Sequence, residues 1–152
     1  MQRFTDMINN MLVSVFNKIL RYEEDFLQKG LARGMTIREM HMIEYVGASG
    51  EEGRTSSEIA DFLEVARPSV TVAVRKLEGK GFLTKSGWAP DGRVVRVTLT
   101  RDGRKVYMHH MRFHALMVSE LEGCFSEEEK DVLSRALSKL DDFFSRRIEG
   151  TK

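Results

Sequence analysis

Apolar residues recur at three- and four-residue intervals over most of this 152-residue chain, which predicts a largely helical protein. Long amphipathic helices are expected over residues 5–29, 101–122 and 127–149. A shorter helix over residues 37–48 is apolar on several sides, so we expect it to be buried. Three helix starts carry a capping box, in which a hydroxyl residue is followed three positions later by glutamate: Thr36 with Glu39, Thr55 with Glu58, and Ser126 with Glu129.

The central stretch, residues 55–100, changes from helical spacing to short β-branched runs. Proline near the start of its second helix fits a first turn, because that turn has no hydrogen-bond partner for an N–H. Two helices at a tight turn followed by a hairpin predict a winged helix-turn-helix, so the expected fold class is mainly α with a small β-hairpin wing. The expected elements are helices near 56–63 and 67–80 and strands at 82–85 and 94–99, with turns at 63–66 and 89–93.

The second of these helices has two unlike faces. One face is apolar and would seat the helix on the domain core, through Val70, Ala73, Val74 and Leu77. The other carries short hydroxyls, a methyl-bearing side chain and cations, a set suited to base edges, thymine methyl groups and phosphates in a DNA major groove. The predicted DNA-binding residues of this helix are Arg67, Ser69, Thr71, Val72, Arg75 and Lys76. The alternative is a solvated helix face that binds nothing.

Charge is distributed unevenly, although the net charge is only +1. Residues 54–105 hold 11 Lys and Arg against 6 Asp and Glu, so the centre is basic and the ends are acidic. This distribution is typical of a DNA-binding protein whose dimerisation region is separate from its DNA-binding region. The single cysteine, Cys124, excludes an internal disulfide, and no secretory or membrane-spanning run appears, so we expect a cytoplasmic protein. No nucleophile elbow, phosphate loop or paired-cysteine motif is present, so we do not expect an enzyme.

The three long helices have more apolar surface than a small winged domain can cover. We therefore expect one domain over residues 1–152, in which residues 36–100 form the DNA-binding region and the helices at 5–29 and 101–149 form a homodimer. A two-fold dimer presents two recognition helices about 34 Å apart, which fits a pseudo-palindromic double-stranded DNA operator. The alternative is that these helices close the core of a monomer.

Much of the chain resembles the MarR family of transcriptional regulators. The resemblance lies in ARPSVTVAVRKLEGKGFLTK, in the wing DGRVVRVTLTRDGRKV and in the flanking long helices. In that family the wing arginine enters the minor groove and the aspartate steadies it, so the resemblance gives these roles to Arg93 and Asp91. A narrow minor groove attracts a guanidinium because its negative potential is concentrated. Ala66 and Gly92 depart from the usual pattern, which has a hydroxyl N-cap and a second arginine there.

Within the family, the segments IREMHMIEYVG, VTVAVRKLEGKGFL, HHMRFHALMV and SEEEKDVLSRALSKLDDFF are similar to the repressors of bacterial fatty-acid biosynthesis genes. That likeness implies repression, with an acyl chain carried on acyl-carrier protein as the effector. Methionine is unbranched and adaptable, so a methionine-lined channel could hold a flexible chain. The predicted lining is Met7, Met11, Met40, Met108, Met111 and Met117. The alternative is that these methionines fill gaps in the core.

The histidines support a different effector. His110 and His114 are four apart and so share one helix face, and with His41 and Glu24 they could bind zinc tetrahedrally. Zinc-sensing members of the same family place ligands at similar positions. The alternative is that His110 and His114 form hydrogen bonds with Glu24 or Glu44. A further alternative, a winged helix that contacts only protein, is disfavoured by the cations Arg67, Arg75, Lys76 and Arg93.

Overall fold

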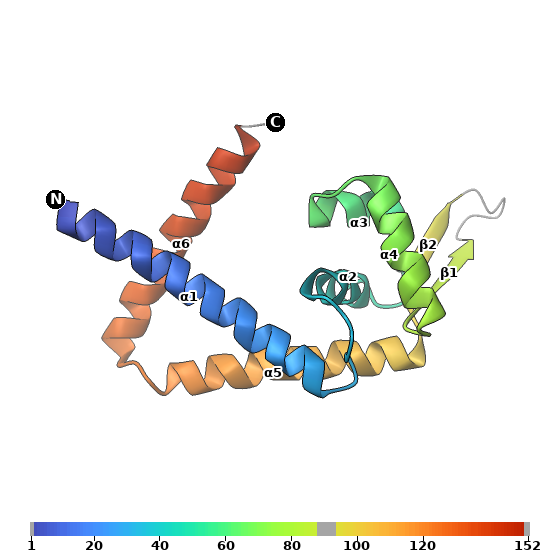
Figure 1. Ribbon diagram of the computed structural model, residues 1–152, viewed down its shortest axis with the longest axis horizontal. Coiled ribbons are helices and arrows are strands. Elements are labelled where there is room, and N and C mark those ends of the chain that lie inside the picture. The colour runs from blue at the N-terminus through green and yellow to red at the C-terminus, as the bar shows by residue number, and fades with distance from the viewer. Residues whose placement is uncertain (1, 88–93, 151–152) are drawn as a thin grey trace. The chain divides into compact units, whose positions relative to one another are not determined.

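The computed structural model describes residues 2–87 and 94–150, and the chain divides into two compact units, Met1–His110 and Met111–Lys152. Among the residues that the structure describes, no helix is both long and apolar enough to cross a membrane. The elements in chain order are α1 (Gln2–Lys29), α2 (Ile37–Gly47), α3 (Ser56–Leu63), α4 (Arg67–Gly79), β1 (Leu83–Gly87), β2 (Val95–Leu99), α5 (Arg101–Glu122) and α6 (Glu127–Glu149) (Figure 1). The predicted fold class, mainly α with a two-stranded wing, is confirmed.

All three predicted capping boxes are present, at the starts of α2, α3 and α6. In α2, for example, the Glu39 N–H donates to Thr36 Oγ1 at 3.2 Å and the Thr36 N–H donates to Glu39 Oε2 at 3.0 Å. Helix α4 differs, because its N-cap residue Ala66 makes no side-chain cap bond. The helix-turn-helix corner after α3 is made by Glu64, which has a left-handed backbone with φ 52° and ψ 44°.

The hydrophobic core lies where α2 meets its neighbours. Helix α2 contacts α1, α3 and β2, while α4 contacts α3 and β1. The predicted inner face of α4 is confirmed, because Val70, Val74 and Leu77 are all fully buried. They share the core with residues from every element of the first unit, including Leu27, Met40, Ile43, Val46, Ile59, Leu83, Val97 and Val106.

The wing is an antiparallel pair in which Leu83 faces Leu99 and Gly87 faces Val95. Its strands begin one residue later than predicted, at Leu83 and Val95. Arg54, just before α3, adds a short bridge to β2 through two backbone hydrogen bonds with Val97, of 2.9 and 2.7 Å. The predicted wing turn at 89–93 lies outside the described residues.

A close backbone contact fixes the start of α5. Thr100 is the N-cap, because its Oγ1 accepts the Gly103 N–H at 3.0 Å, and its own N–H donates to the Phe82 carbonyl at 3.0 Å. A Cβ at Gly103 would fall 1.9 Å from that same carbonyl oxygen. In the sequence Leu99-Thr100-Arg101-Asp102-Gly103, Leu99 therefore supplies a core side chain and Thr100 the helix cap. Gly103 leaves room for the backbone of Phe82.

The long helices expose apolar faces in the isolated chain. On α1 the exposed side chains are Met7, Met11, Leu12, Val15, Phe16, Ile19 and Tyr22. In the second unit, the end of α5 and α6 expose Leu116, Val118, Leu121, Val132, Leu137, Phe143, Phe144 and Ile148. Contiguous exposed apolar faces of this kind mark interaction sites.

Candidate functional site

The outward face of α4 is open to solvent. Thr71, Val72 and Arg75 are exposed, and Val72 keeps 68% of its surface accessible. Thr71 Oγ1 donates to the Arg67 carbonyl at 3.2 Å, which orients the hydroxyl along the helix. A cation, a hydroxyl and a large apolar side chain on one free helix face form a surface that can enter a major groove.

The flank of α4 is different, because its polar groups contact the segment around the start of α2. Lys76 Nζ lies 2.7 Å from Glu39 Oε1, and Lys80 Nζ donates to the Gly34 carbonyl at 2.9 Å. Burial by itself raises the pKa of Glu39, but the hydrogen bonds from Lys76 and Thr36 outweigh it, so the pKa lies below its ordinary value. Lys76, predicted from sequence to bind DNA, therefore already has a partner within the chain. Sequence reasoning gave Glu39 its capping role but missed its contact with Lys76.

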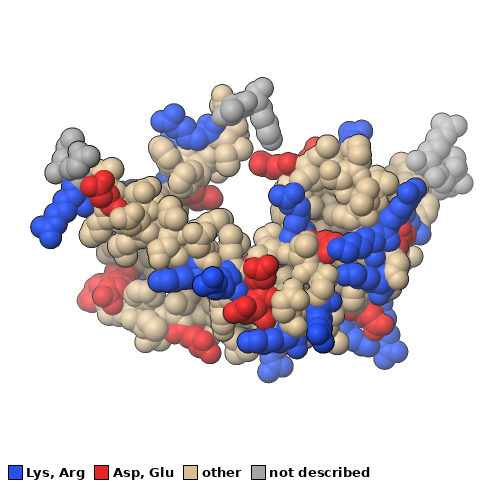
Figure 2. Space-filling model, in the orientation of Figure 1, with Lys and Arg blue, Asp and Glu red and all other residues tan. Residues whose placement is uncertain are grey.

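Basic side chains collect around this helix and the wing. On the face drawn in Figure 2, Lys and Arg gather over the part of the first unit that holds α4, β1 and β2. Lys85 on β1 pairs with Glu78 on α4 at 2.7 Å and so joins the wing to the recognition helix. Asp91 and Arg93, the two predicted wing residues, lie outside the described residues.

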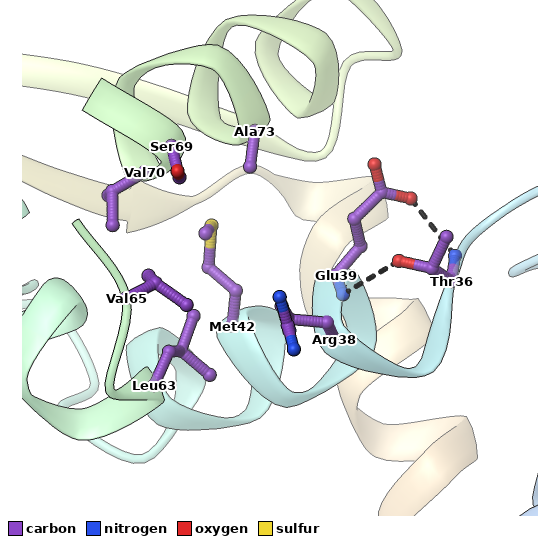
Figure 3. A pocket seen from close by; sticks show the side chains of 9 residues that line it. All are labelled: Thr36, Arg38, Glu39, Met42, Leu63, Val65, Ser69, Val70 and Ala73. Atoms are coloured by element: carbon purple, nitrogen blue, oxygen red, sulfur yellow. Dashed lines mark hydrogen bonds between the residues drawn. The ribbon is translucent and has the colours of Figure 1, made fainter. Parts of the chain in front are cut away.

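A pocket of about 180 Å³ lies between α2 and the inner side of the helix-turn-helix. Figure 3 shows Met42 at its centre, Arg38 and Glu39 rising from α2, and Ser69 of α4 on the opposite wall. Ser69, which was also predicted to bind DNA, is exposed and lines this pocket, and its DNA contact stays a prediction. The full lining is Thr36, Arg38, Glu39, Met42, Leu63, Val65, Ser69, Val70 and Ala73.

A larger pocket, of about 500 Å³, has walls from α1, α2 and α3. Its apolar residues are Leu20, Ile37, Phe62 and Leu63, and its polar ones are Arg38, His41 and Glu64. Its volume is in the range of small-molecule sites, about 300–1,000 Å³. Phe62 is half exposed and stacks on Tyr45 with ring centroids 4.0 Å apart.

None of the six methionines predicted to line an effector channel lines either of these pockets. Met40 is fully buried in the core, where it fills space between helices. Met7, Met11, Met108 and Met111 are exposed, and Met117 is half-buried. The methionine channel stays a prediction.

Helices α1, α2 and α5 bring two histidines and two carboxylates together in the first unit. His110, only 1% exposed, lies with Nδ1 2.8 Å from Glu44 Oε1 and with Nε2 3.0 Å from Glu23 Oε1. His41 Nε2 lies 3.4 Å from the same Glu23 oxygen. Burial by itself lowers the pKa of His110, but the hydrogen bonds and negative charges of Glu44 and Glu23 outweigh it and raise the pKa above its usual range.

This cluster shares only His41 and His110 with the predicted metal set. Glu24, the predicted ligand, is exposed, while its neighbour Glu23 is buried at 4% exposure and contacts both imidazoles. A step of one residue turns a helix by about 100°, so only one of the two can face the core. His110 and Glu44 form the hydrogen bond that was the alternative to metal binding. His114, one turn after His110 on α5, is half-buried.

Two of the distances between donor atoms suit a zinc ion. The distances from Glu23 Oε1 to His110 Nε2 and His41 Nε2, 3.0 and 3.4 Å, are close to the edge of about 3.3 Å that zinc bond lengths give a tetrahedral site. Glu44 would accept the Nδ1 proton of His110 and so leave Nε2 free to bind a metal, as outer carboxylates do in many zinc proteins. Without a metal, the contact between His110 Nε2 and Glu23 Oε1 needs a proton between the two atoms, because a bare nitrogen lone pair repels a carboxylate.

Solved structures that this chain resembles include complexes with DNA. The FabT protein of Streptococcus pneumoniae, solved in complex with DNA, superposes with a TM-score of 0.87 and 34% identity over 93% of this chain and 97% of FabT. The transcriptional regulator ZitR of Lactococcus lactis is 31% identical over 113 residues, which cover 72% of this chain and 76% of ZitR. The Staphylococcus aureus MepR–DNA complex shares the fold, with a TM-score of 0.71 at 22% identity over 88% of this chain and 94% of MepR. The profile of the MarR family matches residues 33–94, and the chain belongs to this family of DNA-binding transcriptional regulators.

Proposed function

We propose that this regulator is a repressor of fatty-acid biosynthesis genes and that its effector is an acyl chain carried on acyl-carrier protein. The observation that carries the proposal is the whole-chain likeness to FabT, at 34% identity over 97% of that protein. The four sequence segments that resemble the fatty-acid branch of the family point the same way. Binding would place Thr71, Val72 and Arg75 of α4 in the major groove, with the wing residues Asp91 and Arg93 alongside.

The 500 Å³ pocket is the best candidate for the effector in the first unit. Its apolar walls suit a hydrocarbon chain, and Arg38 and His41 offer polar groups for a thioester or a phosphopantetheine arm. Leu63 ends α3 and Glu64 is its C-cap, so an occupant would press on the helix-turn-helix corner. The ligand would then bind one orientation of α4 more tightly than another. A ligand needs such a preference to shift the protein between two conformations.

A DNA-binding assay tests this proposal. Anisotropy of labelled duplexes from upstream of the protein's own gene and of a fatty-acid biosynthesis operon should show tighter binding with long-chain acyl-carrier protein than with unacylated carrier. Phe62→Ser should lose most of this response. Leu31→Ser removes an equally exposed apolar residue outside the pocket and should keep it. An acyl response that is absent in the wild type, or equal in the two variants, contradicts the proposal.

We also propose that the protein acts as a homodimer that buries the exposed face of α1. Phe16 is 62% exposed in that face, so Phe16→Glu should shift the sedimentation coefficient toward a monomer and abolish high-affinity operator binding. Asn17→Glu adds the same charge on the opposite side of α1 and should leave the dimer intact. A Phe16→Glu protein that stays dimeric would assign the interface elsewhere.

A second candidate effector is zinc, which the cluster of Glu23, His41, His110 and Glu44 favours. His114 remains the predicted fourth ligand. Calorimetric titration of chelator-treated protein should give about one Zn²⁺ per chain and a higher melting temperature. The neighbouring pair Glu23→Gln and Glu24→Gln separates the buried carboxylate from the exposed one. Only the first should lose binding, and equal zinc affinity in both variants would remove the candidate.

A further inference from the structure

The recognition helix α4 is joined to α2 by one buried carboxylate. Glu39 accepts the Thr36 N–H through Oε2, which caps α2, and holds Lys76 Nζ through Oε1 at 2.7 Å. The Glu39 side chain is 9% exposed, whereas that of Lys76 is 47% exposed. One end of this contact is therefore fixed within the domain and the other reaches the flank of the DNA-reading helix.

We propose that Glu39 is a positioning residue that sets the orientation of α4 against α2, and that Lys76 serves this contact and not a DNA phosphate. This inference rests on DNA binding through α4. On a helical wheel of α4, Pro68 and Val72 lie between Lys76 on one side and Thr71 and Arg75 on the other. Lys76 is therefore on the flank of the outward face. Lys80, one turn after Lys76, makes a parallel contact with the Gly34 carbonyl, so two lysines on one flank point toward the same loop and helix start.

The packing between α2 and α4 next to this ion pair is incomplete. The 180 Å³ pocket opens between α2 and α4 next to Glu39, so apolar side chains do not fill the whole interface (Figure 3). A partly open interface permits small rotations of a helix that close packing would forbid. The Glu39–Lys76 pair spans the edge of this pocket and limits those rotations.

Removing either partner should therefore lower affinity for the operator while non-specific DNA affinity stays the same. Glu39→Gln keeps the capping box, because glutamine also satisfies that motif, and loses only the charge that holds Lys76. We expect roughly a fivefold loss of operator affinity, near the upper end for partly exposed ion pairs. Lys76→Met should give a similar loss, and the double variant should be no worse than either single one.

Salt dependence separates this role from a phosphate contact. A cation that neutralises a phosphate contributes about 0.9 to the slope of log affinity against log salt. Lys76→Met should leave that slope unchanged if Lys76 is occupied by Glu39. The matched control, Glu129→Gln, alters the equivalent capping box of α6 and should not change DNA binding.

Three results would overturn the proposal. A slope reduced by about 0.9 in Lys76→Met would make it a phosphate contact. A gain of operator affinity in Glu39→Gln would mean that only a repulsive charge had been removed. Unchanged operator affinity in both single variants would show that packing alone orients α4. Failure of the wild type to bind any operator would instead count against the proposed gene targets.

Discussion

Gly103 lies directly against the Phe82 carbonyl, so close that an added Cβ would meet the oxygen at 1.9 Å. The first turn of α5 can approach Phe82, the residue before β1, only because Gly103 has no side chain. Phe82 is also the acceptor for the Thr100 N–H, so displacing its carbonyl would break the cap of α5.

Gly103→Ala should therefore lower the free energy of unfolding by about 2–4 kcal/mol, because backbone must move to admit one methyl group. Urea unfolding followed by circular dichroism measures this. Gly79→Ala is the control, since nothing lies within 4 Å of its Cβ position and alanine favours a helix. That variant should be as stable as the wild type or up to about 1 kcal/mol more stable. Equal stability of Gly103→Ala and the wild type would mean that the contact is looser than described.

Arg75→Ala should weaken operator binding about tenfold or more and relax the base preference at one position, because an arginine that reads a base edge contributes about 1–3 kcal/mol. Competition anisotropy with single-base operator variants measures both effects. Arg135→Ala removes an exposed arginine of α6 and should leave affinity and preference unchanged. Loss of affinity without any change in base preference would make Arg75 a phosphate contact.

Glu44→Gln should lower zinc affinity by roughly 10–100-fold if the histidine cluster is a metal site, because Glu44 orients the His110 ring through Nδ1. Competition with a chromogenic chelator measures the dissociation constant. Glu52→Gln changes an exposed glutamate after α2 and serves as the control. Zinc binding that is insensitive to Glu44 would place the metal elsewhere.

Glu58 makes helix α3 sensitive to acid. The Thr55 backbone N–H, with further contributions from the Thr55 side chain and the charges of Arg96 and Arg54, lowers the pKa of Glu58 below 4.5. Because the folded pKa is lowered, this stabilisation is present above pH 4.5 and is lost as the pH falls through the folded pKa.

Glu58→Gln should accordingly be less stable than the wild type at pH 7, with the difference shrinking as the pH falls below 4.5. Urea midpoints of the two proteins across this range measure the change. A difference that stays constant with pH would mean that the carboxylate charge contributes nothing.

Local signals predicted the helix starts, because a capping box involves residues only three positions apart. The inner face of α4 was equally readable, since Val70, Val74 and Leu77 follow the helical period. The position of Glu23 had a weaker signal. It lies four residues before the buried Leu27, on the same helix face, whereas Glu24 falls outside that face.

The ion pair between Glu39 and Lys76 had no sequence signal. The two residues are 37 positions apart, and on a helical wheel Lys76 lies at the border between the inner and outer faces of α4. Which neighbour a border residue meets depends on how two helices cross, and that is a tertiary property. The same reason separates Ser69, which lines a pocket, from Thr71, which does not.

The backbone bridge between Arg54 and Val97 has a mechanical consequence. It couples the residue before α3 to the middle of β2, so a tilt of α3 carries the hairpin with it unless two backbone hydrogen bonds break. The Lys85–Glu78 pair ties α4 to the same hairpin, so α3, α4 and the wing would move together. An effector that turns these elements by a small angle would change the major-groove and wing contacts at once, which makes a steep response attainable without large motion.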